Sequence, residues 1–152
     1  MRRGARIGVD VGTVRVGVAA CDPDGVLATP VTTLDRGRGD VDALVELVGE
    51  HEAIEAVVGL PLSLSGREGP AATAARAYAA TLATRLAPVP VRMVDERLST
   101  VTAEHGLRTA GVAGRSRRRV IDRMAAVVIL QTALDAERQI GEPPGQIVPG
   151  EG

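Results

Sequence analysis

The chain has almost no aromatic residues and no lysine. Tyr78 is the single aromatic side chain among 152 residues, and all 18 basic residues are arginine. A hydrophobic core must therefore be built from Val, Leu, Ile and Ala. The missing aromatics argue against a protein that binds single strands by stacking bases on aromatic rings.

Cysteine, histidine and long apolar runs are equally scarce. Cys21 is the only cysteine, which excludes a disulfide framework and a thiolate metal site. His51 and His105 have no spacing that suits zinc. No apolar run is long enough to cross a bilayer, and the first residues lack the apolar segment of a signal peptide. We therefore expect a soluble, cytoplasmic protein with no membrane partner.

The length and the ordinary shares of hydrophobic (45%) and charged (24%) residues predict one globular domain. We place this domain at residues 1–140 and predict that residues 141–152 form a disordered tail. The formal net charge is -1, so no overall field attracts nucleic acid. Residues 115–123 nevertheless hold a cluster of arginines, and a local patch can bind phosphate where the total charge does not.

Hydrophobic periodicity predicts alternating strands and helices. Three successive extended runs, the last two separated by the turn "DPDG", indicate antiparallel strands. Two later strands each follow a helix, and two further helices complete the pattern. The expected strands lie within 6–12, 14–21, 26–34, 54–62 and 88–99, and the expected helices span about 41–48, 70–86, 100–111 and 118–137. This order gives an α/β fold with a mixed five-stranded sheet, three strands antiparallel and two reached through helical crossovers, with helices on both faces.

Asp10 is an unexpected residue in the middle of the first strand. Strand alternation places it on one face with Gly8 and Gly12, while Ile7 and Val9 lie on the other face. Two positions without side chains leave room for something to approach the backbone beside the acid. The alternative is an aspartate that faces water at a sheet edge or stabilises a turn.

A second acidic element is Asp95-Glu96-Arg97, where an apolar strand ends. Alternation prevents Asp95 and Glu96 from facing the same site. Open α/β sheets usually bind ligands beyond the carboxyl ends of their strands, so one of these acids is a candidate ligand. The alternative is a solvated strand end with a local ion pair to Arg97.

Asp122 lies on an otherwise largely apolar helix. Carboxylates on such elements are rarely buried unless they are paired or bound to a metal. The alternative is an acid in the first helical turn, stabilised by the helix dipole.

Three carboxylates on separate elements would repel each other if they met without counter-charge. Divalent cations with oxygen ligands, Mg²⁺ or Mn²⁺, remove that repulsion. Two such ions about 4 Å apart form a site for phosphodiester hydrolysis. The sequence thus indicates a two-metal hydrolase acting on ester bonds, provided that Asp10, Asp122 and one of the acids at 95–96 converge.

The chain also resembles a known family. The motifs "GVDVGTVRVGVAA", "VVGLPLSLSG", "VDERLST" and "IDRMAAVVILQTALD", in this order, resemble the YqgF/RuvX family of ribonuclease H-like nucleases, over about residues 6–138. The resemblance implies a ribonuclease H-like fold. It also implies that Asp10, Glu96 and Asp122 are the catalytic metal ligands, with Asp95 as the alternate to Glu96. Many relatives in that superfamily carry an acid on the fourth strand, but "VVGLP" here has none.

The resemblance implies a function in ribosome biogenesis, as a nuclease that matures the 5′ end of pre-16S rRNA. It leaves open a Holliday junction resolvase that acts on four-way DNA. It also leaves open whether the protein is a monomer or a homodimer and whether it meets the pre-ribosome.

Several residues are candidate contacts to a nucleic-acid backbone. Arg15 matches the family's arginine after the first strand, and the "SLSGREG" loop offers hydroxyl and backbone donors. The alternatives are a plain connection for that loop and a solvated surface for the later arginines. The complete candidate set is Arg15, Ser65, Arg67, Arg97, Arg115, Arg117, Arg118 and Arg119.

Two other classes compete with the nuclease. The first motif also resembles the phosphate loop of actin-like ATPases and sugar kinases, but one domain supplies only half of their nucleotide cleft. A non-catalytic module that binds nucleic acid or ribosomes would have no reason to keep three repelling acids together. Metal titration separates the module from the nuclease, and nucleotide protection of the thermal midpoint would favour the ATPase.

Overall fold

The computed structural model describes residues 1–96 and 114–150, and of residues 114–117 it describes the backbone alone. The chain alternates strands and helices as the periodicity predicts. Its elements are β1 (Arg6–Val11), β2 (Arg15–Cys21), β3 (Ala28–Asp35), α1 (Asp40–Glu50), β4 (Glu55–Leu60), α2 (Pro70–Leu86), β5 (Val91–Asp95), α4 (Gly114–Ile140) and β6 (Gln146–Ile147). The helix predicted at about 100–111 lies outside the described residues.

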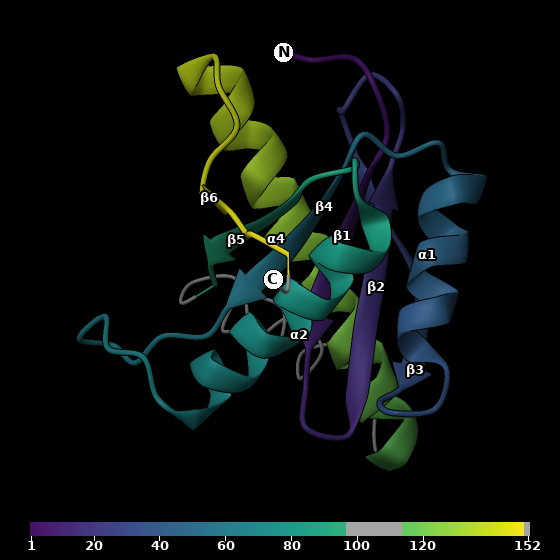
Figure 1. The fold of residues 1–152 in the computed structure, drawn as a ribbon, viewed down its shortest axis with the longest axis vertical. Helices are drawn as coiled ribbons and strands as arrows, with labels where there is room; N and C mark the ends of the chain where they lie inside the picture. The colour runs from purple at the N-terminus through teal and green to yellow at the C-terminus, as the bar shows by residue number, and fades with distance from the viewer. Residues whose placement is uncertain (97–113, 151–152) are drawn as a thin grey trace.

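One mixed sheet organises these strands in the order β3-β2-β1-β4-β5-β6 (Figure 1). β2 pairs antiparallel with β1 and β3, whereas β4 runs parallel to β1 and β5 runs parallel to β4. The register sets Asp10 of β1 opposite Gly17 of β2. The predicted α/β class is confirmed, β1 lies in the interior of the sheet, and the sheet has one more strand than the five predicted.

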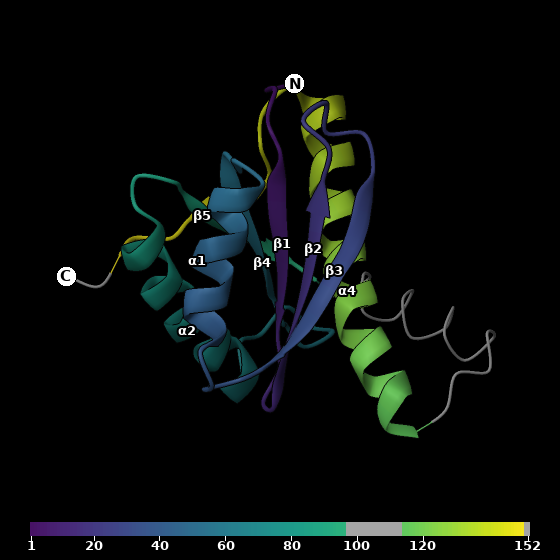
Figure 2. The same ribbon diagram turned by 90° about the vertical axis from the view of Figure 1, so that its right-hand side faces the viewer.

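Helices cover both faces of the sheet (Figure 2). Ile7 and Val9 of β1 pack into the core under α1 and α2, while Ile129 and Leu130 of α4 pack on the opposite face. Because β1 alternates, Gly8 and Asp10 lie on the α4 face. This alternation decides which helix can bring a partner to Asp10.

Helix α4 begins at Gly114 and ends at Ile140, so it is longer at both ends than predicted. Asp122 therefore lies in the third turn of the helix and not in its first turn. The favourable interaction of an acid with a helix dipole fades beyond the first turn, so it does not account for Asp122. No helix in the described part of the chain is both long and apolar enough to cross a membrane.

The end of the chain departs from the predicted disorder. Gln146 and Ile147 form β6, which pairs antiparallel with Met93 and Arg92 of β5. The φ angle of Gly145 is 81°, and a Cβ atom there would overlap the carbonyl oxygen of Met93. Glycine thus lets the chain turn tightly against the sheet edge. Within this Gly- and Pro-rich segment, the short run from Gln146 to Val148 hydrogen-bonds to β5 and forms the last strand of the sheet.

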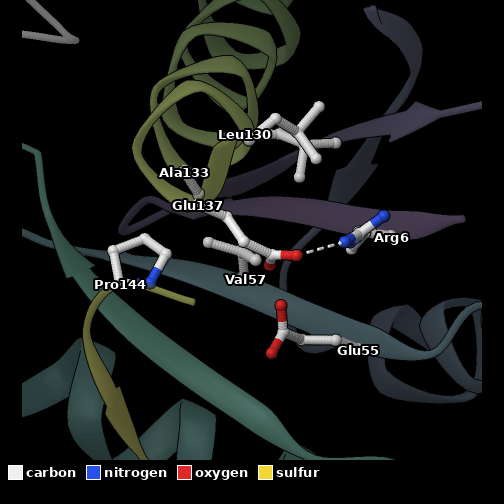
Figure 3. Close-up of a pocket in the computed structure, with 8 residues that line it drawn as sticks. Arg6, Glu55, Val57, Leu130, Ala133, Glu137 and Pro144 are labelled. Atoms are coloured by element: carbon white, nitrogen blue, oxygen red, sulfur yellow. Dashed lines mark hydrogen bonds and ion pairs between the residues drawn. The ribbon is translucent and has the colours of Figure 1, made fainter. Parts of the chain in front are cut away.

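Charged side chains are buried where β1 and β4 begin, on the α4 face. Arg6 and Glu137 are 1% and 3% exposed and pair at 2.9 Å (Figure 3). Arg2 bridges Glu137 at 2.6 Å and Glu55 at 3.1 Å, and Arg92 pairs with Glu55 at 2.6 Å. This network ties the N-terminus, the three strands β1, β4 and β5, and the end of α4 together.

The cavity beside this network is about 10 Å³, which is room for about one water molecule and excludes an organic ligand. Arg6 and Asp10 lie on the same side of β1, four residues or roughly 13 Å apart. The network is therefore a structural feature, separate from the carboxylates at the other end of the strand.

Candidate active site

Three acids approach each other at the carboxyl end of β1. Asp10 is the last but one residue of β1, Glu96 directly follows β5, and Asp122 lies on α4. The charges of Glu96 and Asp122 both act on the carboxyl of Asp10. The three carboxyl groups are therefore near enough for their charges to act on Asp10.

Glycines allow α4 to approach the sheet so closely. A Cβ atom at Gly8 would lie 2.8 Å from Leu130 Cβ and 2.9 Å from the carbonyl oxygen of Ala126. A Cβ atom at Gly17 would overlap the carbonyl oxygen of Asp122. Because Gly17 pairs with Asp10, the contact of Gly17 with α4 brings Asp122 beside Asp10. The sequence predicts a close approach at Gly8, and the object that approaches is helix α4.

Gly12 has a different role from Gly8. Its amide donates a hydrogen bond to the carbonyl oxygen of Arg15 at 2.9 Å, which closes the turn between β1 and β2. A Cβ atom at Gly12 would lie 2.7 Å from that same oxygen. Gly12 therefore shapes the turn and does not leave room for a ligand.

The side chain of Glu96 lies against Gly59 of the neighbouring strand β4. Its amide lies 3.3 Å from the carbonyl oxygen of Leu60, and a Cβ atom at Gly59 would overlap Glu96 Oε2. The carboxyl-terminal half of β4, from Val57 to Leu60, thus carries no acid but provides the space that the Glu96 carboxylate occupies. Asp95 is exposed, and its charge acts on Glu96. Of the two neighbouring acids, Glu96 is the one that faces Asp10.

Electrostatics show how poorly this site tolerates negative charge. Burial raises the pKa of Asp10 to about 7, and the charges of Glu96 and Asp122 add to that shift. Burial, followed by the charge of Asp95, raises the pKa of Glu96 to about 7. Both carboxyl groups therefore ionise less readily than free carboxylic acids unless a cation lies beside them.

Asp122 has a positive partner. Arg15 Nε donates to Asp122 Oδ2 at 2.7 Å, and both side chains are about one-fifth exposed. Arg15 and Gly17 lie on the same face of β2, which places the guanidinium beside the third turn of α4. The sequence predicts a phosphate contact for Arg15, and in the structure Arg15 holds one of the three acids.

The donor set fits a divalent cation in its chemistry. Asp10 and Glu96 offer hard oxygen ligands in a desolvated place with excess negative charge, which is what Mg²⁺ and Mn²⁺ select. Within the described residues, however, no three His, Cys, Asp or Glu side chains are already grouped to hold a metal ion. The charges of the acids are close enough to interact, but their oxygens do not yet converge on one point.

The other predicted contacts lie in two places. Ser65 and Arg67 belong to an exposed loop after β4 that projects from the body of the protein (Figure 1). Ser63 Oγ lies 2.9 Å from Ser65 Oγ and accepts a hydrogen bond from the Arg67 amide at 3.1 Å, so the loop is internally braced. Among the described residues, no hydrogen bond or ion pair joins this loop to the three acids.

The arginine cluster at the start of α4 is only partly described. Arg118 is exposed, whereas Arg119 is half-buried and pairs with Asp35 at 2.7 Å. Arg119 also exchanges hydrogen bonds with Thr33, and Arg123 donates to the Thr33 hydroxyl at 3.3 Å. Arg119 therefore helps to attach α4 to β3. The side chains of Arg97, Arg115 and Arg117 lie outside the described residues.

Sequence reasoning missed Gly17 and Gly59 as parts of the site. Each interrupts an apolar strand, and a lone glycine inside a strand signals a close approach of backbone or ligand. That signal was present in "RVGVAAC" and "EAVVGL", but it does not say which element approaches.

Gly59→Ala should weaken the site while preserving the fold. The added Cβ would displace two flexible side-chain ends, Glu96 Oε2 and Ile129 Cδ1, and no backbone atom. We expect a loss of stability of roughly 1–2 kcal/mol, as for modest overpacking. Mn²⁺ affinity should fall at least tenfold, measured by calorimetric titration, because Glu96 moves. Wild-type Mn²⁺ affinity in a folded Gly59→Ala protein would remove Glu96 from the ligand set.

Comparisons with known proteins agree with this geometry. A family model described as "RuvX: Holliday junction resolvase" matches residues 4–136. A protein of Thermobifida fusca (strain YX), named "Putative pre-16S rRNA nuclease", is 59% identical over 99% of this chain and 99% of its own length. A protein of the same name from Streptomyces coelicolor is also 59% identical, over 96% of this chain and 89% of its own.

The fold has a counterpart among solved structures. RuvC of T. thermophilus, in complex with a Holliday junction substrate, aligns with a TM-score of 0.55 at 15% identity, covering 94% of this chain and 99% of that one. The likeness confirms the predicted ribonuclease H-like fold class. The family model and the two relatives confirm the predicted family, and the chain belongs to the RuvX family.

Proposed function

We propose that this protein is a metal-dependent nuclease that hydrolyses phosphodiester bonds during 5′-end maturation of pre-16S rRNA. The observation that carries the proposal is the approach of Asp10, Glu96 and Asp122 from three separate elements. The names of the two relatives at 59% identity support the rRNA substrate. Such an enzyme would work in the cytoplasm, where precursor rRNA and the pre-ribosome are its partners.

The three acids would hold two Mg²⁺ or Mn²⁺ ions. When bound, such ions polarise the scissile phosphate and lower the pKa of the attacking water. Asp10 would contribute from the sheet, Glu96 from the end of β5 and Asp122 from α4. The protein's own task is to keep these carboxylates in place although they repel each other.

Contacts to the nucleic-acid backbone would surround the acids. Exposed Ser65 and Arg67 and exposed Arg118 are available for phosphate oxygens, and Arg15 lies at the acids themselves. Arg97, Arg115 and Arg117 remain candidates on sequence grounds. Arg119 would have to leave Asp35 to bind phosphate, so we rank it below the exposed arginines.

Metal binding should depend strongly on pH. Asp10 and Glu96 each have a pKa raised to about 7, so at pH 6 most of these carboxyl groups are protonated and a cation must displace the protons. We expect Mn²⁺ affinity to rise at least tenfold between pH 6 and pH 8, with proton release that calorimetry in two buffers detects. An affinity independent of pH over this range would show that these two acids are not ligands.

The resolvase is the second candidate function. The family description, "Holliday junction resolvase", and the likeness to the fold of a RuvC bound to a Holliday junction substrate support it. The choice between RNA and branched DNA requires a direct comparison. The oligomeric state bears on it too, since a symmetric junction offers two cleavage points and suits a homodimer.

One assay compares the two substrates. A pre-16S 5′ leader RNA and a four-way DNA junction, each end-labelled, are incubated with the full chain in Mg²⁺ or Mn²⁺. The proposal expects cleavage of the leader RNA and little or no symmetrical nicking of the junction, with Asp10→Asn as the inactive control. Symmetrical nicking of the junction alone would favour the resolvase. Cleavage of neither substrate, with metal bound, would favour a non-catalytic binding module.

A further inference from the structure

Arg15 occupies an unusual position for a residue expected to bind phosphate. It lies on the α4 face of β2, two residues before Gly17, where the backbone of Asp122 rests. Its Nε donates to Asp122 Oδ2 at 2.7 Å. A guanidinium thus pairs with one of the three acids.

The three acids interact without forming a ligand group. Asp10 senses the charge of Asp122, yet no three His, Cys, Asp or Glu side chains of the described residues are grouped to hold a cation. Asp122 Oδ2 accepts the hydrogen bond from Arg15 Nε. A cation that used this oxygen would compete with Arg15 for it.

The geometry of the pair suits an exchange of partners. Both side chains are about one-fifth exposed, so the guanidinium can still be reached from solvent. The fork of an arginine binds a phosphate with two parallel hydrogen bonds, which is a better arrangement than the single contact through Nε. A nucleic-acid phosphate would therefore draw Arg15 away from Asp122.

We propose that Arg15 is a positioning residue that couples substrate binding to metal binding. Without nucleic acid, Arg15 holds Asp122 and keeps the metal site incomplete. A backbone phosphate takes over Arg15, and the released Asp122 carboxylate completes the ligand set. This inference rests on the proposed nuclease function, and it predicts that the enzyme loads metal fully only on its substrate.

The first test measures the Mn²⁺ affinity of the protein without nucleic acid. Mn²⁺ is titrated into the full chain and followed by electron paramagnetic resonance, with no nucleic acid present. Arg15→Gln should bind Mn²⁺ about 5- to 10-fold more tightly than the wild type, within the usual range of coupling between sites. Arg15→Lys keeps the positive charge, so its Mn²⁺ affinity should stay nearer to that of the wild type. This variant also shows whether the lost packing of the arginine side chain changes the Mn²⁺ affinity.

A matched control separates this effect from a general change of charge. Arg85 pairs with Asp42 at 2.7 Å, between α2 and α1. Arg85→Gln removes the same charge without touching an acid of the site. It should leave the Mn²⁺ affinity within about twofold of the wild type, as expected for an exposed pair.

The second test measures the coupling. A leader RNA with phosphorothioate linkages, which resist hydrolysis, is added and the Mn²⁺ titration is repeated. The RNA should tighten Mn²⁺ binding in the wild type by at least about fivefold more than in Arg15→Gln, whose Asp122 is already released. By linkage, Mn²⁺ should tighten RNA binding by the same factors, which fluorescence anisotropy measures independently.

The outcomes separate the two proposals. Equal Mn²⁺ affinities and equal RNA effects in the wild type and Arg15→Gln would overturn the coupling role, while the nuclease proposal would stand on the leader-RNA assay. Weaker Mn²⁺ binding in Arg15→Gln would also overturn it, because it would make Arg15 a support of the site. Absence of Mn²⁺ binding in both proteins, with and without RNA, would overturn the coupling and the metal-dependent nuclease together.

Discussion

Asp10→Asn should abolish nuclease activity while the protein stays folded. The amide keeps the shape of the side chain but removes the charge that a divalent cation needs. A metal contributes several kcal/mol of transition-state stabilisation, which corresponds to a loss of about 1,000-fold or more in the rate of cleavage. Cleavage of leader RNA with saturating Mn²⁺ measures this loss. Wild-type activity in Asp10→Asn would remove Asp10 from the site.

The same substitution should stabilise the metal-free protein. Asp10 has a pKa raised from 3.8 to about 7, so its ionisation works against folding as the pH rises from about 4 to 7. Asparagine carries no charge, and the expected gain at pH 7 is up to about 4 kcal/mol. Urea unfolding in EDTA at pH 4 and pH 7 measures it. A gain at pH 7 that disappears at pH 4 identifies relief of charge, whereas equal gains at both pH values would point to packing.

Glu137→Gln should cause the largest loss of stability of the substitutions considered. Glu137 is 3% exposed and accepts hydrogen bonds from Arg2 at 2.6 Å and from Arg6 at 2.9 Å. The amide would leave the buried Arg6 guanidinium without a negative partner, at a cost of about 3–5 kcal/mol. Denaturant unfolding at pH 7 measures the loss. Nuclease activity of the remaining folded protein should be unchanged, because the network lies at the far end of β1.

The pH dependence of this loss tests its cause. Burial alone would raise the pKa of Glu137, but hydrogen bonds and charge from Arg2, with the charge of Arg6, outweigh burial and lower it to about 2. A depressed carboxyl pKa stabilises the fold above the unfolded value of about 4.3, and that stability fades as the pH falls towards 2. The difference between wild type and Glu137→Gln should therefore shrink below pH 4.

Asp42→Asn is the matched control. Asp42 also pairs with an arginine, Arg85, at 2.7 Å, but its side chain is 74% exposed. The same change from acid to amide should cost less than about 1 kcal/mol there. Equal losses in Asp42→Asn and Glu137→Gln would show that burial is not what gives the network its effect.

The strands and the faces of the sheet could be predicted because they follow from local pattern. Alternation in "RIGVDV" is enough to place Asp10 on one face of the sheet and Ile7 and Val9 on the other face, and the structure agrees. The helix that covers Asp10 could not be predicted in the same way. That assignment depends on Gly8 and Gly17 meeting the backbone of α4, which is a contact between residues more than 100 positions apart.

The partners of the arginines are a second feature that the sequence pattern does not predict. An arginine beside a carboxylate site and an arginine in an ion pair have the same sequence signature. Arg15 and Arg119 were both predicted to contact phosphate, yet Asp122 and Asp35 hold them in the structure. Their partners lie 107 and 84 residues away, so local spacing carries no trace of either pair.

The C-terminal residues contain a short strand that their composition does not predict. Composition makes residues 141–152 look disordered, since Pro and Gly dominate. A strand as short as Gln146–Ile147 has no periodicity to detect, and it pairs with the edge strand β5. Only the position of that edge in the sheet shows why the tail is ordered there.

The most direct test of the central claim is a crystal structure of the full chain grown with Mn²⁺ and measured at the manganese absorption edge. The account predicts anomalous density among the carboxylates of Asp10, Glu96 and Asp122, with a second peak about 4 Å from the first once a nucleic-acid phosphate is bound. It also predicts that Asp122 has left Arg15 in that complex. Manganese density away from these three residues, or none at saturating Mn²⁺, would contradict the account.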